Sequence, residues 1–494
     1  MDYSLTSLPF VRNQLPGAAA VLAVAMAASG IPAALAQPAG PVEQRVAASL
    51  QRIETRDRDY RAVITLDQQA LARARMLDRQ RRAPGRLYGE PILLKDNIES
   101  VGLPTTAGSQ ALAENNTGRD ARLVSALRSE GAVILGKTNL SEWANFRSEH
   151  SSSGWSAVGG QTRNAIDPLR TPCGSSSGSA VAVALGYVRV AIGTETSGSI
   201  ICPASINGVV GFKPTHGLVS GDGIVPLALT QDTAGPIATD VELAARTLAV
   251  MVDPSARDAE DIRRGLIALD DIDGLRGLRF GVYANTLGYD KRRDANLERI
   301  TALLQAAGAT VVPGLRIDPY DGYGADSYDV LLWEFRRDLN AYLAALPNSL
   351  SELSLARIIR FNEDNADREL KRFDQSIFIR SQALTLTEDG YRDKRERTRT
   401  AMRAEGLDRL FRENSLDALI GVSTSVAWLI DWVNGDASFG RSMAGPAAVA
   451  GNPHITLPLA EIEGLPHGIS LIGERWKDHR LAAIARLVER EAAP

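Results

Sequence analysis

Short apolar runs alternate with helical patterns between about residues 90 and 250. Residues 91–94 and 132–135 are apolar runs of strand length, and residues 122–130 between them carry apolar positions at helical spacing. A strand, a helix and a strand in this order favour parallel pairing in a sheet that helices cover. We expect the alternation to continue with a helix at 179–185, strands at 188–192 and 208–212, and a helix at 241–251.

The chain outside this central part is mostly helical in pattern. Residues 41–85 are charged, with apolar positions at helical spacing and no strand-like run, which predicts amphipathic helices. Residues 279–283 predict a strand and residues 294–307 a helix. A long charged stretch at 350–415 predicts further helices, which we interpret as a helical insert of about 340–415. We expect the chain to return to the same sheet in two strands, at residues 416–421 and 455–458.

Length and composition fit one large α/β unit. The chain has 494 residues, and no long linker rich in proline, serine or glycine divides it. Its 44% hydrophobic and 23% charged residues are ordinary for a globular protein. The net charge of -4, without a run of basic residues, gives no reason to expect a nucleic-acid partner.

The first 36 residues differ from the rest. An apolar run at 17–30 follows a polar start, and the small residues 34–36 follow in turn, which is the pattern of a secretory signal peptide. The run is too short to span a bilayer, although an uncleaved amphiphilic anchor is the alternative. We therefore expect a signal peptide at 1–36, a mature domain at 37–494 that is periplasmic or secreted, and no stable membrane span.

The chain has two cysteines, Cys173 and Cys202. Export would permit a disulfide between them without requiring one, and we expect two buried free thiols. Their spacing does not match a metal site, and no Gly-Lys-Ser/Thr loop for nucleotide phosphates is present. The sequence thus predicts neither a metal nor a cofactor.

Two clusters of serine among glycine are the strongest chemical signal. They are Gly-Ser-Ser-Ser-Gly-Ser at 174–179 and Gly-Thr-Glu-Thr-Ser-Gly-Ser at 193–199. A serine hydroxyl needs a neighbouring base to become a nucleophile, and none of the five histidines lies in a motif that would mark it as that base. Lys95 ends the apolar run at 91–94, where burial would lower its pKa and leave a neutral amine able to accept a proton. The alternative is a surface lysine that extends from a strand end.

The second cluster also suits an oxyanion hole. Thr196, Ser197 and Gly198 are small, so a substrate carbonyl can approach the backbone closely. Consecutive N–H groups at a turn before a helix would stabilise the negative charge that develops on that carbonyl.

With these motifs the chain resembles the amidase signature hydrolases, most closely the bacterial peptide amidases among them. The matching segments run from about residue 87 to 251, with weaker matches at 417–436 and 444–473. The resemblance implies a base at Lys95, a relay serine at Ser175 and a nucleophile at Ser199.

The resemblance also implies a fold and a reaction for the whole protein. It implies a large mixed sheet with helices on both faces, and a cis peptide bond entering Ser175. It also implies hydrolysis of a carboxamide, most closely the C-terminal amide of a peptide, through an acyl-enzyme. A peptide or small-molecule amide is then the expected partner, and the protein is expected to be a monomer without a cofactor.

Four positions depart from the family pattern. Cys173 and Ser177 replace glycines, although the peptide amidases share this change. Ser197 replaces a glycine or an acidic residue, and Ile201 stands where many members carry arginine. The loss of that arginine leaves the partner of Glu195 undefined.

Other functions fit parts of the sequence. Residues 174–178 also match the Gly-x-Ser-x-Gly motif of histidine-dependent esterases, with Ser176 central, but a loop and not a strand precedes them. A general aliphatic or aromatic amidase, the amidase subunit of a tRNA-dependent amidotransferase and an inactive binding protein are further alternatives. Residues 151–160 and 428–432 are candidates for lining the substrate pocket.

Overall fold

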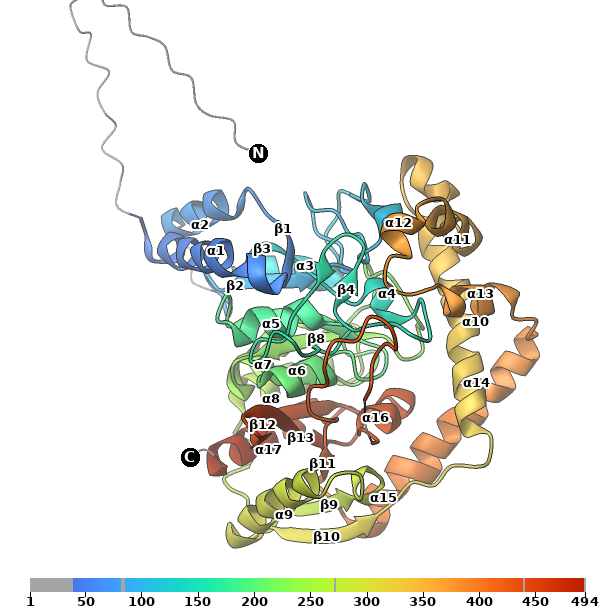
Figure 1. Ribbon diagram of the computed structural model, residues 1–494. Helices are drawn as coiled ribbons and strands as arrows, with labels where there is room; N and C mark the ends of the chain where they lie inside the picture. Colours follow the sequence, from blue (N-terminus) through green and yellow to red (C-terminus); the bar gives the residue numbers. More distant parts are fainter. Residues whose placement is uncertain (1–38, 81–84, 271, 439, 493–494) are drawn as a thin grey trace, which may run out of the picture. The chain divides into compact units, whose positions relative to one another are not determined.

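One mixed sheet of eleven strands organises the part of the chain that the structure describes (Figure 1). This computed structural model describes residues 39–80, 85–270, 272–438 and 440–492, so the expected signal peptide lies outside the described residues. The described residues from position 40 onward form one compact unit. The strands, in order across the sheet, are β1 (Val63–Leu66), β3 (Val133–Thr138), β2 (Pro91–Lys95), β6 (Val190–Glu195), β8 (Thr233–Ala238), β7 (Val210–Lys213), β12 (His454–Ile462), β13 (Leu465–Ile472), β11 (Ala418–Val422), β9 (Arg279–Tyr283) and β10 (Thr310–Leu315).

The strand directions confirm the predicted parallel pairing at the centre of the fold. β2 pairs in parallel with both β3 and β6. β8 pairs antiparallel with both β6 and β7, so the sheet is mixed. Parallel strands end at the same edge of a sheet. The carboxyl ends of β2 and β6, at Lys95 and Glu195, therefore lie at one edge.

Helices cover both faces of the sheet, as expected. Side chains alternate across β2: Ile92 and Leu94 belong to one apolar cluster and Leu93 to another. The first cluster includes α3 (Arg122–Ser129), α7 (Val241–Met251), α8 (Ala259–Ala268), α9 (Lys291–Ala306) and α17 (Asp478–Glu491). The second includes α1 (Pro41–Tyr60), α2 (Ala70–Arg79), α5 (Ser177–Ala184) and α6 (Ile201–Asn207).

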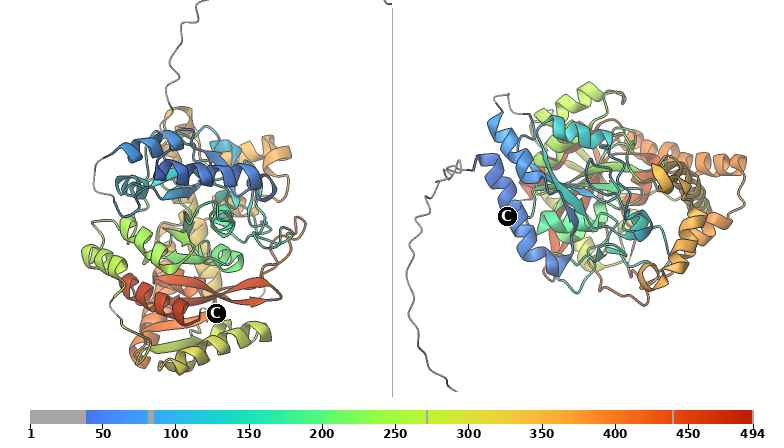
Figure 2. Two further views of the ribbon diagram at one scale, coloured as in Figure 1. Left: turned by 90° about the vertical axis from the view of Figure 1, so that its left-hand side faces the viewer. Right: turned by 90° about the horizontal axis from the view of Figure 1, so that it is seen from above.

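A run of helices connects β10 to β11, and Figures 1 and 2 show it on one side of the sheet. Its residues Phe335 and Phe378 pack with Trp143 and Phe146 of the central part of the chain. The helices are α10 (Tyr323–Ala344), α11 (Leu355–Asp364), α12 (Ala366–Glu369), α13 (Ser376–Ala383), α14 (Glu388–Met402) and α15 (Asp408–Asn414), with a π-helical turn at Arg403–Leu407 between the last two.

The prediction that residues 41–85 contain no strand was wrong. Val63–Leu66 forms β1, which pairs antiparallel with β3 at the edge of the sheet. All four residues are only half-buried, so the strand lacks the apolar alternation that marks a buried strand. Its position depends on β3, which is distant in sequence. Among the described helices, none is long and apolar enough to cross a membrane.

Candidate active site

Lys95 ends β2 and is completely buried, as predicted. Its Nζ lies within hydrogen-bond distance of Ser175 Oγ at 2.6 Å, Thr194 Oγ1 at 2.8 Å and the Thr194 carbonyl at 3.2 Å. A neutral amine carries two hydrogens and one lone pair. The two Thr194 oxygens can accept those hydrogens, which leaves the lone pair for the Ser175 hydroxyl.

Burial controls the protonation of this lysine. Removal from water lowers the pKa of Lys95 to about 7, because the charged form loses its hydration. The carboxylates of Asp232 and Glu195 oppose this shift by favouring the ammonium form. A substantial fraction of Lys95 is therefore neutral near pH 7.

Ser175 stands on the loop before α5 (Ser177–Ala184). The peptide bond from Gly174 to Ser175 is cis, as expected from the family resemblance. The Ser175 carbonyl accepts from the Ser141 backbone N–H at 3.1 Å, and its side chain is fully buried. These contacts hold the Ser175 hydroxyl against Lys95.

Ser199 lies in the turn between β6 and α6, next to the Ser175 loop. Its carbonyl accepts from the Ser176 backbone N–H at 3.1 Å. No hydrogen bond joins the hydroxyls of Ser175 and Ser199 in the described part of the chain. Catalytic hydrogen bonds are often long or poorly aligned before substrate binds, so the lack of a hydrogen bond between these two hydroxyls is compatible with a proton relay.

The turn at residues 196–199 offers free backbone donors. Among the described residues, none accepts a hydrogen bond from the backbone N–H groups of Ser197, Gly198 or Ser199. Gly198 has a φ of 91°, a left-handed conformation that glycine adopts most readily. Ser197 is exposed, and a substrate carbonyl can therefore reach these N–H groups.

One buried carboxylate, Glu195, and one half-buried carboxylate, Asp232, support this turn. Glu195 Oε2 accepts from the backbone N–H groups of Ile200 and Ile201, at 2.8 and 3.0 Å. Glu195 therefore bonds to the backbone N–H of Ile201, a position at which the sequence was expected to depart from the family pattern. Asp232 accepts from Thr196 Oγ1 at 2.5 Å, and burial raises the pKa of Asp232 to about 7.

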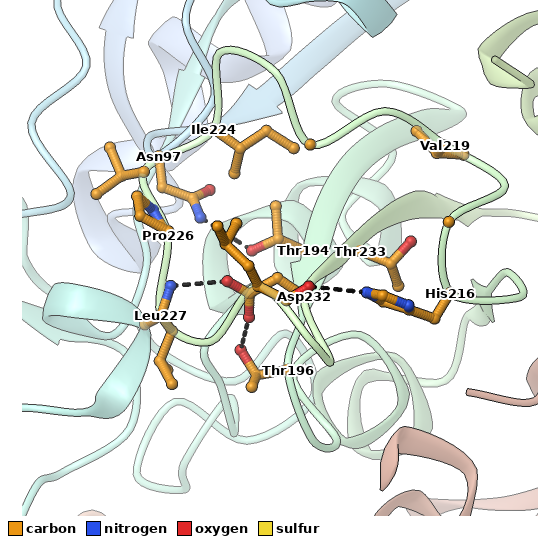
Figure 3. A pocket seen from close by; sticks show the side chains of 15 residues that line it. Asn97, Thr194, Thr196, His216, Val219, Ile224, Pro226, Leu227, Asp232 and Thr233 are labelled. Carbon is orange, nitrogen blue, oxygen red and sulfur yellow. Dashed lines mark hydrogen bonds between the residues drawn. The ribbon is translucent and has the colours of Figure 1, made fainter. Parts of the chain in front are cut away.

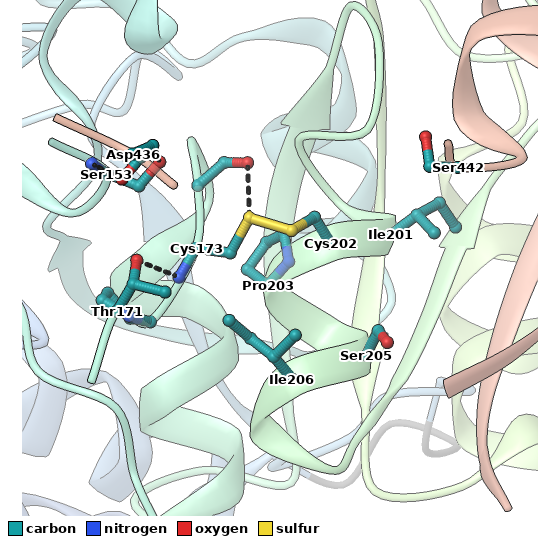
Figure 4. Close-up of a disulfide and its surroundings, with 12 residues drawn as sticks. Ser153, Thr171, Cys173, Ile201, Cys202, Pro203, Ser205, Ile206, Asp436 and Ser442 are labelled. Atoms are coloured by element: carbon teal, nitrogen blue, oxygen red, sulfur yellow. Dashed lines mark hydrogen bonds between the residues drawn. A yellow bond between two sulfur atoms is a disulfide. The ribbon is translucent and has the colours of Figure 1, made fainter. Parts of the chain in front are cut away.

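The expectation of two free thiols was wrong, because Cys173 and Cys202 form a disulfide (Figure 4). Their Cα atoms are 6.0 Å apart, although 29 positions separate the residues in the chain. Cys173 precedes Ser175 by two residues, and Cys202 follows Ser199 by three. The disulfide thus ties together the two loops that carry these serines.

Loss of this disulfide is expected to weaken both the fold and the site. The substitution Cys173→Ser with Cys202→Ser should lower the free energy of unfolding by about 3 to 4 kcal/mol, from the entropy of a loop of this length. It should also lower kcat roughly tenfold or more, because small displacements of reacting groups slow catalysis strongly. Thermal unfolding and ammonia release, with and without a thiol reductant, measure both effects.

The double variant is its own control. The reductant should weaken the parent protein and leave the variant unchanged. A parent that keeps its stability and activity after mass spectrometry shows full reduction would contradict this role of the disulfide.

A cavity of about 150 Å³ is lined by Thr194, the hydrogen-bond partner of Lys95 (Figure 3). Thr194 Oγ1, which accepts from Lys95, also accepts from Asn97 Nδ2 at 3.0 Å, and both Thr194 and Asn97 line the cavity. Asn97 Oδ1 is buried and has no hydrogen-bond partner in the described part of the protein. Apolar walls complete the cavity, from Val219, Ile224, Pro226, Leu227 and Leu229.

Ala144 also lines this cavity, from an unusual turn. Trp143, Ala144 and Asn145 all have positive φ values, of 50°, 56° and 70°. Such a run of non-glycine residues is strained and needs support from its surroundings. Arg147, fully buried, supplies that support through hydrogen bonds to the Glu142 carboxylate and the Glu369 carbonyl.

Sequence reasoning did not identify Asn97, Thr194 or Asp232. Asn97 follows Lys95 by two residues and Thr194 belongs to the second serine cluster, so nearness in sequence could have marked both. Asp232 comes from the start of β8, and only the pairing of β8 with β6 brings it to the site. The predicted lining segments 151–160 and 428–432 border a separate groove, through Trp155, residues 156–160 and Trp432.

The geometry does not favour a histidine-dependent esterase. Ser176, the central serine of the Gly-x-Ser-x-Gly match, is fully buried, and its Oγ donates to the Thr194 carbonyl at 3.0 Å. His454 Nε2 bonds to Ser470 Oγ, and His216 Nε2 bonds to the Leu229 carbonyl. In the described ranges, no group of three or more histidine, cysteine, aspartate or glutamate side chains could hold a metal ion.

Comparison with known proteins agrees with this geometry. The amidase family model matches residues 44–482. A probable amidase of Arabidopsis thaliana is 36% identical over 462 residues, which cover 90% of this chain and 85% of that protein. A glutamyl-tRNA(Gln) amidotransferase subunit of Symbiobacterium thermophilum is 36% identical over 436 residues, 84% of this chain and 86% of that protein.

A solved structure shares the whole fold. The native peptide amidase of Stenotrophomonas maltophilia is 42% identical, with a TM-score of 0.83 over 91% of this chain and 93% of that chain. The match thus extends over most of the fold. The chain belongs to the amidase family, whose members hydrolyse amide C–N bonds.

Proposed function

We propose that the protein hydrolyses the C-terminal carboxamide of peptides, with Ser199 as nucleophile, Ser175 as proton relay and Lys95 as base. The observation that carries this proposal is the contact of 2.6 Å between Lys95 Nζ and Ser175 Oγ. Lys95 is buried and its pKa lies at about 7, so it is suited to accept a proton. Similarity to the peptide amidase of Stenotrophomonas maltophilia supports the substrate class.

The first half of the reaction forms an acyl-enzyme. Neutral Lys95 takes the proton of Ser175, Ser175 takes the proton of Ser199, and Ser199 Oγ attacks the carboxamide carbon. The carbonyl π electrons move to oxygen, and the N–H groups of residues 197–199 stabilise this oxyanion. The relay then returns the proton to the amide nitrogen, the C–N bond breaks and ammonia leaves.

The second half reverses the proton path. Water loses a proton through the same relay and attacks the ester that joins the substrate to Ser199. The carbonyl re-forms as the bond to Ser199 Oγ breaks, and the proton returns to this oxygen. The products are a peptide carboxylate and the free enzyme.

An ammonia-release assay on a peptide amide, a small aliphatic amide and glutamine tests the substrate class. We expect kcat/KM to be at least about tenfold higher for the peptide amide, because contacts to remote parts of a substrate can stabilise the transition state. Protein carrying Ser199→Ala is the control for contaminating activity. A preference for the small amide would contradict the proposal and favour a general amidase.

The glutamine arm of the assay tests a second alternative, the amidotransferase function. Amidotransferase subunits are among the relatives at 36% identity, so glutamine hydrolysis above the peptide-amide rate would favour that function. We also propose a periplasmic or secreted location. The disulfide between Cys173 and Cys202 supports this, because disulfides persist chiefly in oxidising compartments.

A further inference from the structure

A groove of about 710 Å³ gathers basic side chains outside the reaction site. Its walls are the end of α1, the hairpin of β4 (Trp155–Ser156) and β5 (Gly160–Gln161), and the residues after α12. This volume lies in the range of ligand sites. Two carboxylates, Asp59 and Asp367, also line the groove. The six cationic residues are Arg58, Arg61, Arg163, Arg368, Lys371 and Arg372.

These cations lack anionic partners. In the described part of the chain, none of the six lies within 4.0 Å of a carboxylate oxygen, whereas Arg147 and many surface arginines form ion pairs. A concentration of unpaired positive charge in a recess attracts anions. The excess is notable in a chain whose net charge is -4.

Packing holds two of the arginines in place. The Arg372 guanidinium stacks on the Trp432 ring at 3.6 Å, and Trp432 Nε1 donates to Gln161 Oε1 at 3.0 Å. Gly160 makes room for Arg61, since a Cβ there would lie 2.4 Å from Arg61 Nη1. Arg372 and Arg61 thus pack against the walls of the groove.

Hydrogen-bonded loops connect the groove to the reaction site. Gln161 Nε2 donates to the Ser153 carbonyl at 2.9 Å, and the Ser153 backbone N–H donates to Asp436 at 3.0 Å. Figure 4 shows Ser153 and Asp436 close to Cys173. Trp432 is four residues from Asp436, so their Cα atoms are at most about 14 Å apart.

We infer that this groove binds acidic residues of the peptide substrate, upstream of the carboxamide that reacts at Ser199. This inference rests on the proposed hydrolysis of peptide amides. An extended peptide advances about 3.3 Å per residue, so a substrate several residues long can extend beyond the reaction site toward the groove. Arginine forks bind carboxylates through paired hydrogen bonds, which suits glutamate and aspartate side chains.

Matched peptide amides test this inference. Both end in the same neutral residues and carboxamide, and one carries a run of glutamates several residues upstream where the other carries glutamines. We expect a KM roughly tenfold lower for the glutamate peptide at low salt, with kcat unchanged. The difference should disappear in about 0.5 M salt, which screens exposed charges.

Charge-reversal variants locate the effect. Arg58→Glu with Lys371→Glu reverses one exposed cation from α1 and one that follows α12. This variant should lose the preference for glutamate and keep its rate on a small amide. Arg276→Glu with Lys291→Glu, outside the groove, changes the net charge equally and should keep the preference.

The outcomes separate two kinds of failure. A protein that hydrolyses small amides but neither peptide amide would overturn the proposed function. Hydrolysis of both peptides with equal KM, or equal effects of the two charge-reversal variants, would overturn the groove assignment alone. The parent protein could also sediment with vesicles of anionic lipid while the Arg58→Glu, Lys371→Glu variant does not. If this occurred without a preference for the glutamate peptide, the groove assignment would be overturned in favour of binding to a membrane surface.

Discussion

Replacement of Ser199 by alanine is expected to lower kcat by about 10⁴-fold or more, because no other group can form the acyl-enzyme. Ser175 and Ser176 are fully buried, whereas Ser199 lies in the turn with the free backbone N–H groups. Ammonia release from a peptide amide measures the loss, and mass spectrometry after incubation with a reactive acyl substrate detects the ester on the parent protein.

Ser197→Ala is the matched control, because it removes a neighbouring hydroxyl and keeps the backbone N–H that faces the substrate. We expect its kcat to stay within about threefold of the parent value, since oxyanion stabilisation depends on the N–H group. Ser199→Ala that retains activity, or an acyl adduct on Ser176, would contradict the assignment of the nucleophile.

The local sequence pattern was sufficient to predict the central strands and the burial of Lys95. An apolar run ending in lysine marks a strand whose last side chain is buried, and the structure places Lys95 there with no exposed surface. The strand, helix and strand between residues 91 and 138 also follow from alternation alone. In both cases the information lies within a few consecutive residues.

Contacts between distant segments could not be predicted in this way. The disulfide needs α6 to lie beside the loop before α5, and the contact of Asp232 with Thr196 needs β8 to pair with β6. The basic groove illustrates the same limit, because its six cations come from α1, the segment after β5 and the residues near α12. None of these segments is a basic run by itself.

The position of Lys95 also connects the fold to the chemistry. Its Nζ is buried between Thr194 of β6 and Ser175 of the loop before α5, and this burial removes the water that would keep the amine protonated. The same packing places Thr194 and Ser175 within hydrogen-bond distance. One packing arrangement thus sets both the proton affinity of the lysine and its contact with the relay.

Replacement of Lys95 by methionine is expected to lower kcat/KM by about 10³-fold or more and to change its pH dependence. Methionine keeps the length and the apolar stem of the side chain and removes the amine. In the parent protein, kcat/KM should fall about tenfold per pH unit below pH 7, because protonation of Lys95, whose pKa is about 7, removes the acceptor. Above pH 7 the neutral amine predominates and the rate should level off.

Asp232→Asn identifies the group that causes this pH dependence, because the pKa of Asp232 also lies at about 7. The Asp232 carboxylate raises the pKa of Lys95, so its removal should move the fall in kcat/KM to lower pH without abolishing it. In Lys95→Met the fall near pH 7 should be absent. If it persisted in Lys95→Met and disappeared in Asp232→Asn, Asp232 and not Lys95 would be the titrating group, and the role of Lys95 as base would be wrong.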